Sequence, residues 1–242
     1  MKLGTPNALD QEVKTPLFPD CDLIGETDQH LSRLSDNGPM VHPGIADALQ
    51  ALRQKASDAG FDMRIASGFR SFDRQLLIWN NKALGLRPVL DDVGRPVDMS
   101  QLNDDEKVFA ILRWSALPGA SRHHWGTDVD VYDASRMPDH YELQLTTEET
   151  EGDGVCAEFH QWLTVELQDN PSGFYRPYVK GVGGISPEPW HLSYAPLARI
   201  FATQLTEAVL REKLQATDIA LKDSVLKLLP SIYQNYIKPY QL

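Results

Sequence analysis

Two short stretches of this 242-residue chain combine histidines with acids. The first reads Ser-Arg-His-His-Trp-Gly-Thr-Asp-Val-Asp at residues 121–130, and the second reads Glu-Pro-Trp-His at 188–191. A hydrolytic zinc site needs three nitrogen or oxygen ligands, an open coordination position and a carboxylate that takes the proton of water. The two stretches contain such a set, so the fold must bring together segments about sixty residues apart.

The spacing within the first stretch constrains its local structure. His123 and Asp130 are seven residues apart, and a continuous helix or strand would separate them. They converge if His123 precedes a strand and Gly126 allows a sharp turn. On the strand, Asp128 and Asp130 share a face because side chains repeat every two residues. Spacing alone therefore leaves either aspartate as a ligand, and either His123 or His124.

The second stretch is irregular at its proline. Residues three apart on a strand point to opposite faces. Pro189 interrupts the ladder of hydrogen bonds, so Glu188 can bend back toward a metal held by His191. One of the two groups would then be a ligand and the other a base. The alternative interpretation is a surface glutamate beside buried aromatic residues.

The order of elements predicts an α+β fold, with a small antiparallel sheet flanked by helices and a C-terminal helical extension. Apolar periodicity and capping residues predict helices near 44–59, from Ser71, 103–115 and 155–167. Alternation predicts strands near 61–67, 126–132 and 190–192. The chain divides into an irregular N-terminal arm at 1–40, a main domain at 41–195 with an acidic insertion at 134–154, and helices at 196–242. The apolar stripe of these last helices packs on the domain or pairs two subunits, giving a monomer or a homodimer.

Composition excludes several classes of partner. The formal net charge is -11 and Lys and Arg form no cluster, so we expect no nucleic acid partner. No apolar run approaches the ~20 residues of a membrane span. The first residues lack the apolar core of a secretory signal, which predicts a cytoplasmic protein, or a periplasmic one if a signal peptide has been removed. Cys21 and Cys156 are too few and too far apart for a disulfide framework.

The combined motifs point to a known family. The pattern S-x-H-x-x-G-x-x-x-D followed by E-x-W-H resembles the VanY-type D-alanyl-D-alanine carboxypeptidases, a family of zinc peptidases related to LD-carboxypeptidases and phage peptidoglycan endopeptidases. Upstream, residues 67–75 resemble the family segment S-G-[YF]-R-[ST]-x-x-x-Q. The three blocks follow the order of the family, and the resemblance covers about residues 40–195.

The resemblance implies a role for each motif residue. His123, Asp130 and His191 would bind one Zn²⁺ ion, which selects His123 over its neighbour and Asp130 over Asp128. Glu188 would be the catalytic base.

The remaining implied residues concern the substrate. Arg70 would be a catalytic cation that binds substrate and stabilises the oxyanion, and Gln75 and Ser121 would line the substrate cleft. The chain departs from the family pattern at Asp128, where a small residue is usual, and at Ser193, where an arginine is common.

The implied activity is removal of a C-terminal D-amino acid from a peptidoglycan peptide or muropeptide by a D,D- or L,D-carboxypeptidase. One alternative is an endopeptidase that cuts within the stem or the cross-bridge. Another is a non-catalytic wall-binding module with a structural zinc. Glu188 argues against the last, since a closed structural site needs no spare base and usually uses cysteines.

Overall fold

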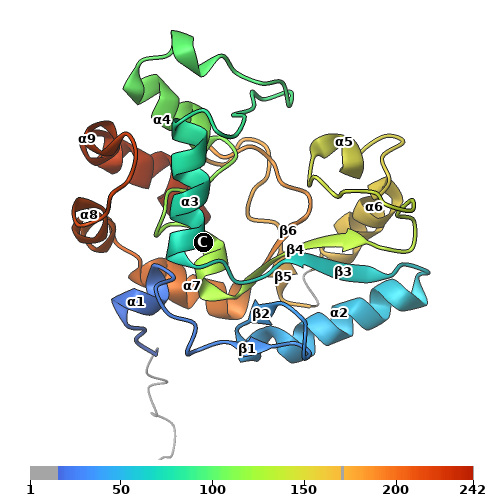
Figure 1. Ribbon diagram of the computed structural model, residues 1–242. Coiled ribbons are helices and arrows are strands. Elements are labelled where there is room, and N and C mark those ends of the chain that lie inside the picture. Colours follow the sequence, from blue (N-terminus) through green and yellow to red (C-terminus); the bar gives the residue numbers. More distant parts are fainter. Residues whose placement is uncertain (1–15, 170–171, 242) are drawn as a thin grey trace, which may run out of the picture.

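A four-stranded antiparallel sheet with the order β3-β4-β6-β5 lies at the centre of the molecule (Figure 1). The computed structural model describes residues 16–169 and 172–241. The strands are β1 (Ser32–Arg33), β2 (Met40–Val41), β3 (Met63–Ser67), β4 (Asp128–Asp133), β5 (Phe174–Tyr175) and β6 (His191–Tyr194). Strands β1 and β2 form a separate two-stranded sheet. The predicted α+β class is confirmed.

Helices surround the sheet on several sides (Figure 1). They are α1 (Asp20–Leu23), α2 (Ala46–Asp58), α3 (Phe72–Ala83), α4 (Asp104–Leu112), α5 (Thr147–Thr150), α6 (Ala157–Glu166), α7 (Ala195–Gln204), α8 (Glu207–Gln215) and α9 (Lys222–Ile232). Short 3₁₀ turns are η1 (Pro43–Ile45), η2 (Met99–Gln101), η3 (Arg122–Trp125) and η5 (Lys238–Tyr240), and η4 (Tyr233–Ile237) is a π-helix. Ser71 and Asn103 cap α3 and α4, which confirms the two predicted helix starts.

Strand β4 has one apolar face and one acidic face. Val129 and Val131 are fully buried in a cluster formed by the sheet, α2 and α6. Asp128 and Asp130 alternate with them and therefore point to the other face. The period of two in the sequence thus places two carboxylates on one side of the central strand.

The C-terminal helices belong to the largest hydrophobic cluster. Residues of α7, α8 and α9 pack there with Phe72 and Trp79 of α3 and with Trp125 of η3. The apolar stripe predicted for the C-terminal helices consequently packs within this chain. Pro230 lies inside α9, which continues past it to Ile232.

The N-terminal arm and the acidic insertion are both partly buried. Of the N-terminal arm, residues 1–15 lie outside the described part, and Leu23 and Ile24 are buried in the main cluster. The acidic insertion at 134–154 contains α5, where Glu149 and Thr150 are buried. Both segments therefore contribute to the packed structure.

Gly126 connects η3 to β4 through a left-handed backbone with φ +66°. Its carbonyl accepts a hydrogen bond from the N–H of His42 at 2.8 Å. A Cβ at this position would lie 2.6 Å from Leu31 Cδ2 and 2.7 Å from His42 N. The turn therefore requires glycine for both its dihedral angle and its close backbone contact.

We predict that Gly126→Ala lowers the free energy of unfolding by about 3 kcal/mol, because backbone strain and steric overlap add. Gly85→Ala is a matched control, since Gly85 has φ +73° and a Cβ added there would meet no atom within 4 Å. That control should lose only the dihedral cost of about 1–2 kcal/mol. Denaturant unfolding measures both variants, and equal losses would contradict the proposed overlap.

Candidate metal centre

The three predicted metal ligands come from adjacent pieces of the chain. His123 lies in η3, Asp130 in β4, and His191 is the first residue of β6. Asp130 and His191 are direct partners in the antiparallel pairing of β4 with β6. The turn at Gly126 returns His123 toward the strand. One ligand atom from each of the three buried residues lies within 4.8 Å of the others.

Hydrogen bonds determine which ring nitrogen of each histidine is free. His123 Nδ1 donates to the carbonyl oxygen of Gly68 at 2.8 Å, since a carbonyl can only accept. His123 Nε2 then faces Asp130 Oδ2 at 3.2 Å. His191 Nε2 donates to Asp128 Oδ1 at 3.0 Å, while its Nδ1 faces Asp130 Oδ1 at 3.3 Å. His123 Nε2 and His191 Nδ1 therefore point to a common position beside Asp130.

Asp128 is fully engaged by other groups. Its oxygens accept hydrogen bonds from Arg122 Nε at 2.8 Å and from the Thr127 hydroxyl at 2.7 Å, besides the one from His191. Burial raises the pKa of Asp128, but Arg122 and then His191 lower it to about 2. The carboxylate thus stays ionised as a partner of Arg122, and both of its oxygens already accept hydrogen bonds within the protein.

His124 is a satisfied core histidine. Its Nδ1 donates to the carbonyl oxygen of Arg70 at 2.6 Å, and its Nε2 accepts from the N–H of Gly119 at 3.1 Å. Burial lowers the pKa of His124 to about 3. Both ring nitrogens are used, which leaves His123 as the histidine of η3 that faces the cluster.

Asp130 has an oxygen that the protein does not satisfy. Oδ1 is buried and accepts no hydrogen bond of good geometry from the described residues, although His191 Nδ1 lies 3.3 Å away. Such an oxygen is costly unless a cation occupies the space beside it. Burial raises the pKa of Asp130, but His123 and then His191 lower it below its ordinary value. Two imidazole nitrogens and one ionised carboxylate are a donor set that fits zinc.

Binding of a metal at His191 is coupled to the loss of a proton. Burial lowers the pKa of His191, but hydrogen bonds to Asp128, Asp130 and Glu188 raise it well above its ordinary value. A metal that binds Nδ1 must replace a proton there. Metal affinity should therefore decrease as the pH falls.

Glu188 is placed beside the candidate metal position by a turn. The N–H of His191 donates to the carbonyl oxygen of Glu188 at 3.1 Å, with Pro189 at the second position of the turn. Glu188 Oε2 lies 3.5 Å from His191 Nδ1. The proline thus returns the carboxylate to the same cleft as the ligands.

Arg70 also lines this cleft. One of its guanidinium nitrogens is 4.0 Å from Asp130 Oδ2, and another donates to Gln75 Oε1 at 3.1 Å. Gln75 is fully buried and its amide donates to the carbonyl oxygen of Ala116 at 2.7 Å. It therefore lies behind Arg70 and holds it, instead of lining the cleft as the sequence suggested. Ser121 does line the cleft.

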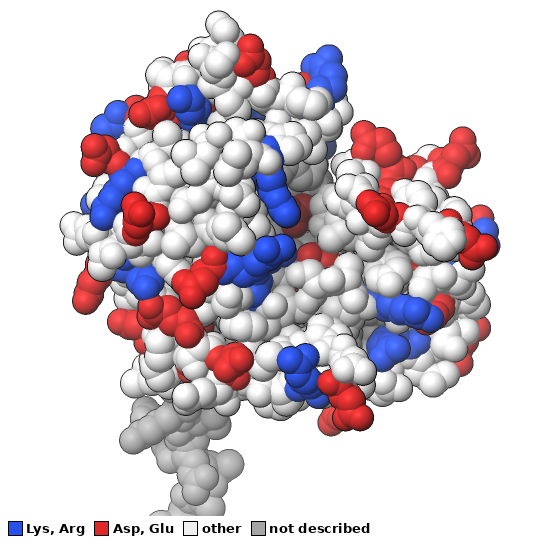
Figure 2. All heavy atoms as spheres, viewed as in Figure 1, with Lys and Arg blue, Asp and Glu red and all other residues white. Residues whose placement is uncertain are grey.

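Two further cations line the cleft with Arg70, and neither belongs to the sequence motifs. Lys82 and Arg87 line the same cleft, which has a volume of about 370 Å³. Burial, and then Arg87, lower the pKa of Lys82. Lys82 lies one helical turn beyond Ile78 on α3, a spacing that could have predicted their common face. Figure 2 shows this hollow with blue side chains on one wall and red atoms inside it.

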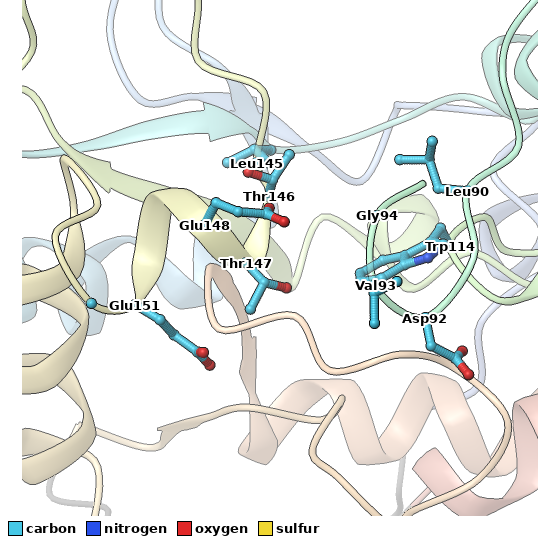
Figure 3. Close-up of a pocket in the computed structure, with 11 residues that line it drawn as sticks. Leu90, Asp92, Val93, Gly94, Trp114, Leu145, Thr146, Thr147, Glu148 and Glu151 are labelled. Carbon is cyan, nitrogen blue, oxygen red and sulfur yellow. The ribbon is translucent and has the colours of Figure 1, made fainter. Parts of the chain in front are cut away.

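A second hollow of about 570 Å³ adjoins the cleft (Figure 3). The two share the lining residues Leu90, Trp114, Leu145 and Thr146. One wall is the segment between α3 and α4 with Trp114, and the other is the acidic insertion. Leu145 has a left-handed backbone with φ +56°, which is uncommon for a non-glycine residue. The insertion thus forms part of the cleft rather than a detached surface loop.

Comparison with known proteins identifies the family of this chain. The sequence model described as "VanY: D-alanyl-D-alanine carboxypeptidase" matches residues 38–197. The chain belongs to the VanY family. The resemblance seen in the motifs is thereby confirmed, and members of this carboxypeptidase family act on peptidoglycan peptides.

Individual relatives of this VanY family member differ in their sequence identity and in how much of each chain is matched. An uncharacterized protein of Haemophilus influenzae is 46% identical over 98 residues, or 39% of this chain and 67% of the relative. A D-alanyl-D-alanine carboxypeptidase of Enterococcus faecalis is 27% identical over 173 residues, or 69% of this chain and 52% of the relative. The match thus spans about half the length of the Enterococcus protein.

The fold has a counterpart among solved structures. The structure described as "VanYB in complex with D-Alanine-D-Alanine" has a TM-score of 0.50 and 23% identity, covering 78% of this chain and 88% of that chain. This likeness supports the fold alone. No helix in the described part of the chain combines the length and apolarity needed to cross a bilayer.

Proposed function

We propose that the chain is a zinc-dependent carboxypeptidase that removes a C-terminal D-amino acid from peptidoglycan peptides. The observation that carries the proposal is the buried cluster of His123, Asp130 and His191, in which Asp130 Oδ1 lacks a hydrogen bond of good geometry and Glu188 lies beside His191. The match to the family model described as D-alanyl-D-alanine carboxypeptidase supports the substrate class.

The residues of the cleft have separate chemical roles in this proposal. His123 Nε2, one oxygen of Asp130 and His191 Nδ1 would hold the ion. When bound, zinc supplies Lewis acidity, which polarises the scissile carbonyl and acidifies water. Glu188 accepts the proton of the attacking water and later delivers it to the leaving amine.

Arg70 stabilises negative charge on the other side of the reacting carbonyl. A guanidinium keeps its charge at any working pH and presents donors in a fixed fork. Gln75 and Ser67 already accept two of its hydrogen bonds, which fixes the direction of the fork. Lys82 and Arg87 extend the cationic wall, which suits the terminal carboxylate that defines a carboxypeptidase substrate.

We predict that His191→Ala abolishes stoichiometric zinc binding. The wild-type protein should carry about one zinc per chain, measured by elemental analysis after dialysis, because three buried ligands converge. His160→Ala is the matched control, since His160 is also buried but lies outside the ligand cluster. Undiminished zinc content in His191→Ala would contradict the ligand assignment.

We predict that Glu188→Gln retains zinc and loses hydrolysis by about 10²-fold or more, because it removes the general base at nearly constant shape. Release of the terminal residue from purified muropeptides, followed by mass spectrometry, measures this loss. The control is Glu142→Gln, an exposed position on the insertion that should leave the rate unchanged. Wild-type activity in Glu188→Gln would assign the proton transfer to another group.

The same digests separate the alternative functions. Loss of a single terminal residue identifies a carboxypeptidase, and internal fragments identify an endopeptidase. The second hollow, which shares four lining residues with the cleft, extends the space available to an endopeptidase substrate. Zinc binding without any product would identify a non-catalytic wall-binding module.

We propose that the insertion selects substrates through Leu145, whose side chain lines both hollows. Leu145→Gly relieves the left-handed strain and removes the side chain, so kcat/KM for longer peptides should fall about tenfold while zinc content stays constant. His140→Gly is the matched control, because His140 has φ +64° on the same insertion, is exposed and lines neither hollow. Equal kinetics in the two variants would limit the insertion to a surface role.

A further inference from the structure

Asp128 is a buried carboxylate for which the proposed reaction gives no role. It lies two residues before Asp130 on the same face of β4 and is fully buried. Its Oδ1 accepts the Nε2–H of His191 at 3.0 Å, on the side of the ring away from Asp130. His191 is therefore held between two carboxylates, one at each ring nitrogen.

Arg122 fixes Asp128 in turn. Arg122 is buried, and its Nε donates to Asp128 Oδ1 at 2.8 Å. Its two terminal nitrogens donate to Ser193 Oγ at 2.6 Å and to the carbonyl oxygen of Tyr240 at 2.6 Å. Every nitrogen of the guanidinium thus has an acceptor, so the ion pair cannot rotate freely.

The two departures from the family pattern meet in this network. Asp128 and Ser193 are direct partners in the pairing of β4 with β6. Ser193 stands where an arginine is common, and its small side chain leaves space that the guanidinium of Arg122 reaches from η3. A guanidinium thus lies beside Ser193, but it comes from η3 and is paired with Asp128.

We propose that Asp128 is a positioning residue that holds His191 as a ligand through Nδ1, and that Arg122 orients Asp128 for this task. The inference rests on the proposed metal site. A carboxylate that accepts the distal N–H of a ligating histidine fixes its tautomer and ring orientation and increases its basicity. Removing such a partner typically lowers metal affinity 10- to 100-fold.

The network also joins the metal centre to a segment far along the chain. Tyr240 belongs to η5, outside residues 38–197 that match the family. Its carbonyl binds Arg122, and its ring packs edge-on against Tyr178 at 5.0 Å. Tyr178 in turn packs edge-on against His191 at 4.7 Å. The C-terminal turn η5 therefore contacts both Arg122 and the aromatic ring that packs on His191.

The test is zinc affinity in Asp128→Asn, measured by competition with a chromophoric chelator, with the cobalt-substituted absorption spectrum as a second readout. We expect affinity to fall 10- to 100-fold and the cobalt spectrum to change, while the three ligands remain. The double variant Arg122→Gln with Asp128→Asn removes both charges, so no lone buried cation opposes folding. It should show the same loss of affinity.

Asp133→Asn is the matched control. Asp133 is a buried carboxylate on β4 that accepts hydrogen bonds from the N–H groups of Asp62 and Ser135 and does not contact His191. It should lose stability without losing zinc affinity. Wild-type affinity in both Asp128 variants would overturn the positioning role, whereas a wild-type protein that binds no zinc would overturn the proposed function itself.

Discussion

Two carboxylates buried on the central strand determine how the rest of the site is built. Asp128 and Asp130 lie on one face of β4, and each must be compensated because an isolated buried charge is strongly unfavourable. Asp128 is compensated within the protein, by Arg122 and Thr127. Asp130 is compensated only in part, because its Oδ1 accepts no hydrogen bond of good geometry from the described residues. The difference between the two defines one structural carboxylate and one that is available to a cation.

His191 connects these two roles. Its Nε2 faces the satisfied carboxylate and its Nδ1 faces the unsatisfied one. Because the ion pair of Asp128 with Arg122 holds one side of the imidazole, it also determines where Nδ1 lies at the candidate metal position. The large hydrophobic cluster also holds η3, which carries His123, because Trp125 of η3 is buried in it with residues of α7.

The sequence predicted those features that depend on local patterns. Alternation indicated the two faces of β4, capping residues indicated the starts of α3 and α4, and the motif spacing required a turn at Gly126. The position of Gln75 behind Arg70 was not predictable, because the motif specifies the residue type and not its burial. The contact of Arg122 with the Tyr240 carbonyl leaves no sequence signal either, since every residue has a carbonyl. The hollow beside the cleft depends on two distant loops and emerges only from tertiary packing.

The alternation of valine and aspartate along β4 has a consequence for folding fidelity. Slipping the strand by one residue would turn Val129 and Val131 toward the cleft and drive two carboxylates into the apolar layer against α2 and α6. Such a misaligned state would lose its hydrophobic contacts and its ligand geometry together. Native packing and an assembled site are therefore selected by the same alignment, and a folded chain without its ligand cluster is energetically disfavoured.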